Sequence, residues 1–150
     1  MARVLITGMS GTGKSTVLGE LAARGYRTVD TDYDEWTDGR GGPWDATRMT
    51  ELLATESTVV VSGTTENQSR FYDRFEHVVL LSAPVDVLID RVRRRSNNPY
   101  GHSVEHQQQI RRHLADVEPL LRRGATVEMD AQVPVDQLAD AISRLAGEPS

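Results

Sequence analysis

Short apolar runs alternate with longer amphipathic segments along the 150 residues of this chain. Val4-Leu5-Ile6 is an unbroken apolar run, as expected of a strand buried on both faces. Similar apolar or β-branched runs predict strands at about 4–6, 27–29, 57–61, 77–81 and 125–129. Helical spacing of apolar residues predicts helices at about 14–23, 45–53, 85–95 and 135–145, and a long one carrying Ile110, Leu114, Val117 and Leu121 on one face.

Residues at the ends of these segments sharpen the predicted boundaries. We expect Gly25 to stop the first helix and Asp45 to cap the second. Pro84 suits the first turn of the third helix, and Pro119 is expected to kink or end the long one. Alternation of strands and helices favours an α/β fold with a parallel sheet covered on both faces, and we read residues 1–150 as a single domain.

Composition narrows the class of protein. The chain has a net charge of −5 and no cysteine, and no apolar run approaches the length of a membrane span. Its first residues lead directly into a strand rather than a signal peptide, so we expect a cytoplasmic protein without membrane or nucleic-acid partners. Arginines gather locally, at 91–95 and 111–112, which suits a small anionic ligand.

The single lysine of the chain, Lys14, lies in the segment Gly8-Met9-Ser10-Gly11-Thr12-Gly13-Lys14-Ser15. This G-x-x-x-x-G-K-S pattern is a phosphate-binding loop, in which glycines let successive N–H groups point at phosphate oxygens. The alternative is a glycine-rich turn that matches by chance. Because the motif follows a buried strand and opens an amphipathic helix, we expect a nucleoside triphosphate site.

Each part of the loop has an expected role. Lys14 should reach the β- and γ-phosphates of ATP and stabilise charge during transfer, and Ser15 should bind Mg²⁺. Thr16 is expected near the α-phosphate. Backbone groups of the remaining positions should hold the phosphates, namely Gly8, Gly11, Thr12 and Gly13.

Three aspartates, Asp30, Asp32 and Asp34, follow the second predicted strand. In open α/β sheets ligands bind at this edge, where a carboxylate can hold the magnesium shell or take a proton from an acceptor. The alternative for any one of them is helix capping, and Asp34 is the best candidate for that. The third strand ends in Ser62-Gly63 rather than in an aspartate, so the metal role falls on Asp30.

Arginines flank the turn-forming segment after the third helix. Arg91 and Arg95 precede a predicted lid at about 96–103 and are candidates to close on the nucleotide, Arg95 as a catalytic group and Arg91 as an ATP ligand. The alternative is a solvated helix face.

The acceptor is expected at about residues 32–54, which include a glycine-rich loop from Thr37 to Trp44. Arg48 and Arg70 are candidates to bind an anionic acceptor, with Arg40 as a further one. Trp36 and Trp44 flank the loop, and burial in the core explains them better than a place in the acceptor pocket.

The phosphate loop, the Val29-Asp30-Thr31-Asp32 segment and the arginine-flanked lid together resemble small P-loop metabolite kinases, shikimate kinases above all and nucleoside monophosphate kinases as a related branch. The resemblance implies a three-layer fold with five parallel strands in the order 2-3-1-4-5. It implies that Asp30 serves magnesium and Asp32 the acceptor hydroxyl, and that Val133 and Pro134 pack on adenine. The chain departs from both branches after the third strand, where Ser62-Gly63-Thr64-Thr65 replaces a glycine run or an Asp-Gly.

The sequence therefore predicts an ATP- and Mg²⁺-dependent kinase that transfers the γ-phosphoryl group to a hydroxyl of a small metabolite. Asp32 would orient or deprotonate that hydroxyl. Two alternatives stay open at this point: a nucleoside monophosphate kinase, and an ATP-binding regulatory module without a small-molecule acceptor. The sequence defines neither the acceptor nor the oligomeric state.

Overall fold

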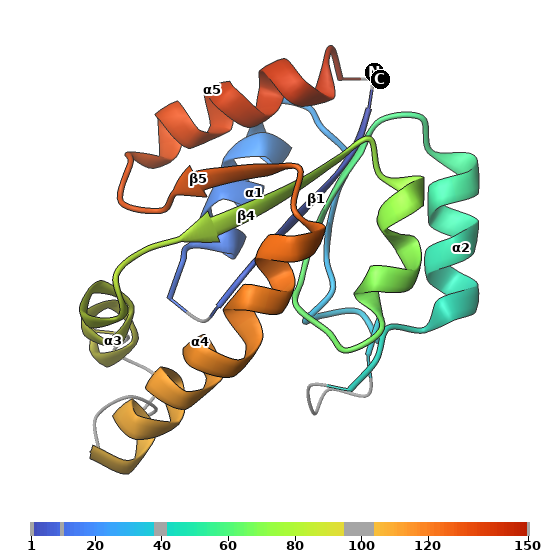
Figure 1. Cartoon of the computed structure of the whole chain (residues 1–150). Coiled ribbons are helices and arrows are strands. Elements are labelled where there is room, and N and C mark those ends of the chain that lie inside the picture. The colour runs from blue at the N-terminus through green and yellow to red at the C-terminus, as the bar shows by residue number, and fades with distance from the viewer. Residues whose placement is uncertain (1, 10, 38–41, 95–103, 150) are drawn as a thin grey trace.

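The fold is described from a computed structural model, which describes residues 2–9, 11–37, 42–94 and 104–149. A five-stranded parallel sheet forms its centre, in the order β2-β3-β1-β4-β5. The strands are β1 (Arg3–Gly8), β2 (Thr28–Asp30), β3 (Val59–Ser62), β4 (His77–Ser82) and β5 (Val127–Asp130). The predicted fold class and strand order are thus confirmed (Figure 1).

The helices are α1 (Lys14–Ala23), α2 (Ala46–Thr55), α3 (Val85–Arg93), α4 (Val104–Gly124) and α5 (Val135–Ala146), with a 3₁₀ helix, η1 (Gln68–Arg74). The residues predicted to end the first helix and to cap the second do so in α1 and α2. Gly25 follows α1 with φ +97°, and the Asp45 side chain accepts a hydrogen bond from the N–H of Arg48 at 3.1 Å. Pro84 stands just before α3 rather than inside its first turn.

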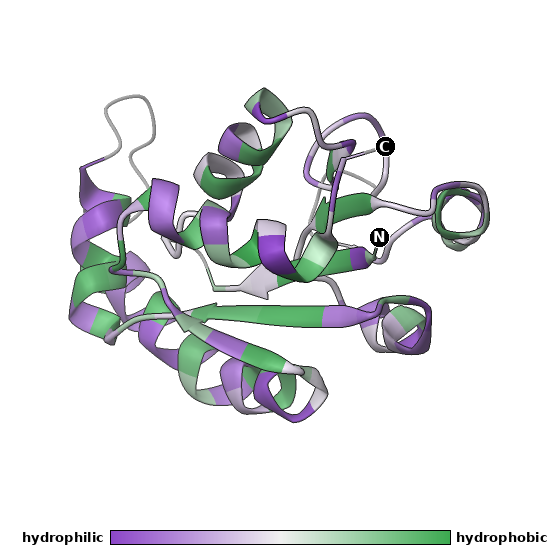
Figure 2. Cartoon of the chain, turned by 90° about the horizontal axis from the view of Figure 1, so that it is seen from above, coloured by the Kyte–Doolittle hydropathy of each residue, from purple (hydrophilic) through white to green (hydrophobic). Residues whose placement is uncertain are grey.

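Alternating side chains of the strands build one core on each face of the sheet. Val4 and Ile6 of β1 pack with α1 and α5, whereas Leu5 packs on the opposite face with α2 and η1. Both tryptophans belong to this second core, where Trp36 is 7% and Trp44 2% exposed. Burial in the core was therefore the right interpretation of both. Figure 2 shows hydrophobic residues of the helices on both sides of the strands.

Two elements differ from the sequence-based prediction. Pro119 was expected to kink or end the long helix; it does not end it, because α4 continues through it to Gly124. Pro119 and Ala115, whose carbonyl loses its helical partner, are both exposed, so water can satisfy that carbonyl. The second difference is η1, which no prediction included and which buries the side chains of Gln68 and Phe71. The proposed lid at 96–103 and residues 38–41 of the glycine-rich loop lie outside the described residues.

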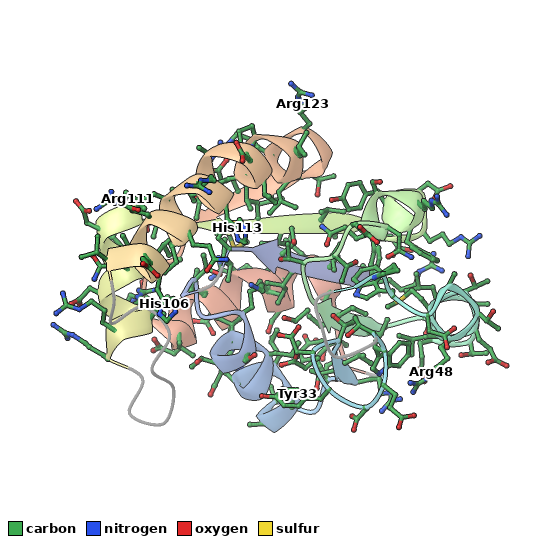
Figure 3. The ribbon with its side chains drawn as sticks, turned by 90° about the horizontal axis from the view of Figure 1, so that it is seen from below. Tyr33, Arg48, His106, Arg111, His113 and Arg123 are labelled. Carbon is green, nitrogen blue, oxygen red and sulfur yellow. The ribbon has the colours of Figure 1, made fainter. Side chains whose placement is uncertain are left out.

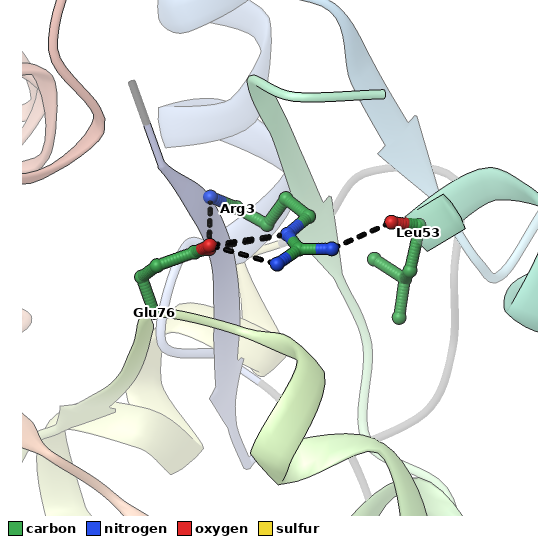
Figure 4. A network of polar contacts seen from close by, with 3 residues as sticks. All are labelled: Arg3, Leu53 and Glu76. Carbon is green, nitrogen blue, oxygen red and sulfur yellow. Dashed lines mark hydrogen bonds and ion pairs between the residues drawn. The ribbon is translucent and has the colours of Figure 1, made fainter. Parts of the chain in front are cut away.

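Polar contacts join the ends of several elements. The Arg3 guanidinium binds the Glu76 carboxylate, with Nη2 and Oε1 2.8 Å apart, and donates to the Leu53 carbonyl at 2.7 Å (Figure 4). The N–H of Ala2 donates to the carbonyl of Ala146, so the beginning of the sheet lies beside the end of α5 (Figure 1).

No helix in the described parts of the chain is both long and apolar enough to cross a membrane.

Candidate active site

The phosphate loop joins β1 to α1 and depends on glycine at defined positions. Gly8, Gly11 and Gly13 have φ values of +154°, +89° and +87°. A Cβ at Gly8 would lie 2.5 Å from the Leu81 carbonyl oxygen, and one at Gly11 2.9 Å from that of Leu88. The backbone conformation therefore favours glycine at all three positions, and the close approach of neighbouring chain also requires it at Gly8 and Gly11.

Lys14 is the first residue of α1, and its side chain lies back across the loop. Its Nζ donates to the carbonyl of Gly8 at 2.7 Å and to that of Met9 at 3.3 Å. Thr12 also closes the loop, since its hydroxyl donates to the Met9 carbonyl at 2.9 Å. The ammonium is thus held at the N-terminal end of α1, where the helix dipole also favours an anion.

Asp30, the last residue of β2, lies beside this helix end. The Ser15 hydroxyl donates to Asp30 Oδ2 at 2.7 Å, and the N–H of Asp32 donates to Asp30 Oδ1 at 3.1 Å. Strand pairing places Asp30 opposite Ser62, at the end of β3. At this edge of the sheet, β2 thus ends in a carboxylate, that of Asp30, whereas β3 ends in a hydroxyl, that of Ser62. A hydroxyl and a carboxylate in contact are a donor set that suits Mg²⁺.

A pocket of about 820 Å³ opens in front of the loop. The phosphate loop and the segment after β2 contribute Gly8, Met9, Lys14 and Asp32 to its lining; the segment after β3 contributes Thr64, Thr65, Glu66, Gln68, Ser69 and Tyr72; α4 contributes His113, Val117, Leu120 and Leu121. Lys14 and Asp32, two of the three residues predicted to be catalytic, therefore line the same pocket. The third, Arg95, lies outside the described residues.

A buried polar network holds the wall of this pocket after β3. Gln68 is 2% exposed, and its Nε2 donates to the Thr7 hydroxyl at 3.1 Å and to the Tyr72 hydroxyl at 2.8 Å. Its Oε1 accepts from the N–H of Thr65 at 2.8 Å. The Thr64 hydroxyl in turn donates to the Gly8 carbonyl at 2.6 Å, which links this wall directly to the phosphate loop.

These wall residues were missed by sequence reasoning. Only the position of Thr64 and Thr65, directly after a strand that ends at the ligand-binding edge, could have drawn attention to them. His113 was missed as well. It was one of several polar residues on a long amphipathic helix. Figure 3 shows it lying over the centre of the molecule, whereas the labelled His106 lies near the N-terminal end of α4.

Arg91 connects the phosphate loop to the segment after β5. Its Nη1 donates to the Gly11 carbonyl at 3.2 Å and its Nη2 to the Ala131 carbonyl at 2.8 Å. Ala131 is followed closely by Val133, which is half-buried, and by Pro134, which is exposed and stands just before α5. Three of the predicted ATP ligands thus lie around one region beside the loop.

The two arginines predicted for the acceptor do not line the pocket. The Arg48 guanidinium lies 4.2 Å from the centre of the Trp36 ring and donates to the Asp34 carbonyl at 2.6 Å. In Figure 3 it lies on the α2 side, away from His113. Arg70 is exposed on η1. The structure therefore gives no support to an acceptor-binding role for either residue.

The loop, the helix behind it and the parallel sheet define a P-loop nucleotide-binding protein. A family model described as an AAA domain matches residues 4–112, so the chain belongs to that family of P-loop domains. Among named relatives, a shikimate kinase from Halorhodospira halophila is 30% identical over 148 residues, covering 86% of this chain and 84% of that protein. A shikimate kinase from Nitrobacter winogradskyi is 28% identical, covering 90% and 72%.

Solved structures agree on the fold. A shikimate kinase from Acinetobacter baumannii in complex with shikimate has a TM-score of 0.72 and 23% identity, covering 97% of this chain and 92% of that one. A gluconokinase from Sinorhizobium meliloti has a TM-score of 0.62 and 23% identity, with 96% and 93% covered. This chain therefore belongs to the shikimate kinase-like family of small P-loop kinases, and it is a phosphotransferase: an ATP-dependent kinase of small metabolites.

Proposed function

We propose that this kinase transfers the γ-phosphoryl group of Mg²⁺-bound ATP to a hydroxyl group of a small metabolite. One observation carries the proposal: Lys14 and Asp32 line the same pocket, beside the contact between Ser15 and Asp30. A cation for the phosphates, a carboxylate for the acceptor and a magnesium donor set are the parts that phosphoryl transfer requires. We further propose that it does so in the cytoplasm.

The phosphate loop and Lys14 would bind the donor. The loop N–H groups and the start of α1 attract the β- and γ-phosphates, and Lys14 stabilises the negative charge that spreads over the transferred group. Ser15 and Asp30 would hold Mg²⁺, which when bound neutralises charge on the phosphate oxygens. Thr16, which is exposed on the first turn of α1, would bind the α-phosphate. Val133 and Pro134 would pack on the adenine, with Arg91 beside them.

Asp32 would prepare the acceptor. Its carboxylate orients the hydroxyl and accepts its proton as the oxygen forms a bond to the γ-phosphorus and the bond to the β-phosphate oxygen breaks, which leaves ADP. The N–H of Asp32 is bound to Asp30, so the two carboxylates are held in one turn with separate tasks. Positioning of this kind, rather than covalent chemistry, supplies most of the acceleration.

Replacing Asp32 tests the proposal. We expect Asp32→Asn to lower kcat for phosphoryl transfer by about 10²- to 10⁴-fold while ATP affinity changes little, because the amide cannot take the proton. The measurement is ADP release over a panel of hydroxyl metabolites, with ATP binding followed by calorimetry. Asp34→Asn is the matched control, since Asp34 is exposed in the same turn and does not line the pocket. Normal turnover by Asp32→Asn would contradict the role.

The same panel addresses the nucleoside monophosphate kinase alternative, which the relatives favour less. Stimulation of ADP release by AMP, CMP, GMP or UMP would support that alternative. Tight ATP binding without ADP release for any acceptor would favour a regulatory module instead.

A further inference from the structure

Carboxylates outnumber lysine and arginine side chains among the described residues that line the acceptor pocket. Two carboxylates line it, Asp32 after β2 and Glu66 after β3. Lys14 is the one lysine of the chain, and its ammonium lies against the loop carbonyls where the transferred phosphate is bound. Among the described residues no arginine lines the pocket, so His113 is the other nitrogen base that faces an acceptor there.

The nearby arginines of known position are engaged elsewhere. Arg91 donates to two backbone carbonyls, of Gly11 and Ala131, and Arg48 stacks on Trp36. Among the residues that the structure describes, a carboxylate or phosphate group on the acceptor would therefore face Asp32 and Glu66 and no guanidinium. Like charges within one partly enclosed site repel each other.

The wall opposite the phosphate loop is apolar. Val117, Leu120 and Leu121 of α4 form it, and the ring of Tyr72 adjoins them. Leu120 is 57% exposed and is thus open to a bound molecule, whereas Leu121 is 5% exposed. Side chains of this kind gain free energy by covering an apolar face of a bound molecule.

We infer that the acceptor is an uncharged or positively charged hydroxyl compound with one apolar face, such as a cyclic polyol or amino alcohol, and that it carries no carboxylate or phosphate group. This inference rests on the proposed function, since it names the substrate class of the same pocket. Asp32 binds the reacting hydroxyl, Glu66 binds a second hydroxyl or an ammonium group, and the leucines of α4 cover the apolar face.

The test uses cyclic hydroxyl compounds of one skeleton in three charge states. Shikimate, its carboxamide and the corresponding aminomethyl compound form one series; gluconate, glucitol and glucamine form an open-chain comparison. Binding to the protein saturated with Mg²⁺ and a non-hydrolysable ATP analogue is measured by titration calorimetry. We expect the uncharged or amine member to bind at least about tenfold more tightly than the carboxylate. A carboxylate that binds as tightly, or failure of every uncharged and cationic member to bind, would overturn the inference.

Two variants test the preference for uncharged or cationic acceptors over carboxylates, which we call the charge rule, independently of overall affinity. Glu66→Gln should reduce the preference for the amine over the carboxylate by about tenfold, and Val117→Arg should strengthen carboxylate binding by a similar factor. Asp73→Asn is the control, because it removes one exposed carboxylate from the neighbouring η1 without touching the pocket. Equal preferences in all three variants would overturn the inference.

ADP release with the same compounds separates this inference from the proposed function. Phosphorylation of the carboxylate members in preference to the others would keep the kinase and overturn the charge rule. Binding of the uncharged or amine members without ADP release would keep the charge rule and overturn phosphoryl transfer.

Discussion

At the scale of single residues, Thr31 sets the directions of the two carboxylates beside it. Its N–H and its hydroxyl both donate to the Ser62 carbonyl, at 3.0 and 2.9 Å, and its side chain is fully buried. Asp30 and Asp32 are thereby turned toward Ser15 and the pocket. The contact leaves no space on the β3 side, because a Cβ at Gly63 would lie 2.0 Å from the Thr31 hydroxyl oxygen.

Gly63→Ala should therefore damage both stability and activity. We expect the free energy of unfolding to fall by about 1–3 kcal/mol, as for other overpacked sites, and phosphoryl transfer to fall because Asp30 and Asp32 move. Urea denaturation and ADP release measure the two effects. Gly19→Ala is the control: it lies in α1 with nothing within 4 Å of its added Cβ, and it should stabilise by about 0.5–1 kcal/mol. A Gly63→Ala protein as stable and active as the wild type would contradict this account.

At the scale of elements, η1 connects two other parts of the site, β1 and α4. Gln68 connects it to β1 through Thr7, and Tyr72 brings it against α4. Gly124, the last residue of α4, lies so close that an added Cβ would be 2.1 Å from the Tyr72 ring. The position of α4, and with it the apolar wall of the pocket, thus depends on the contact of α4 with Tyr72 of η1.

Gln68→Leu tests this connection. The substitution leaves the Thr65 N–H without its buried acceptor, so we expect the free energy of unfolding to fall by about 1–3 kcal/mol. The acceptor KM should rise more than the affinity for ATP falls, because the affected wall faces the acceptor. Denaturation and steady-state kinetics measure these changes. Gln137→Leu, on the exposed surface of α5, should change neither. Unchanged stability in Gln68→Leu would show that the network contributes little.

The limits of sequence reasoning also lie at this scale. The strands and the main helices could be predicted because apolar periodicity marks them, and the phosphate loop because its glycines and lysine have a fixed spacing. The 3₁₀ helix η1 could not, since seven residues show no helical period and its key residue, Gln68, is polar yet buried. Arg48 was misleading for a related reason: sequence gives its charge, but only the fold shows it lying on Trp36.

At the scale of the whole molecule, ion pairs join elements that are far apart in the chain. Arg3 and Glu76 join the start of β1 to the start of β4, with side chains 29% and 40% exposed. Burial alone would raise the pKa of Glu76, but hydrogen bonds from the side chain and the N–H of Arg3 outweigh it and lower that pKa. The Arg122 guanidinium, joined by the Ser82 hydroxyl, likewise lowers the pKa of Glu128 and ties α4 to β5.

The lowered pKa of Glu76 gives a pH dependence of defined sign. A carboxyl that binds protons less readily in the folded state stabilises the fold above its unfolded pKa of about 4.3, and this contribution is lost as the pH falls through the lower folded value. Glu76→Gln should thus lower the free energy of unfolding by about 0.5–1 kcal/mol at pH 7, and the difference should vanish in acid. Denaturation at several pH values measures it, with the exposed Glu51→Gln as control. A difference that grows in acid would contradict the assignment.

The position of Lys14 has a practical consequence for chemistry carried out on this protein. It bears the only side-chain amine of the chain, and that amine lies across the phosphate loop. A fluorophore, cross-linker or sensor surface that couples to amines finds a single lysine side chain here, inside the nucleotide site, besides the α-amine of the chain. Every molecule coupled through the Lys14 amine is therefore also a molecule with a blocked donor site, and the extent of coupling at Lys14 in the presence of ATP becomes a direct count of unoccupied sites.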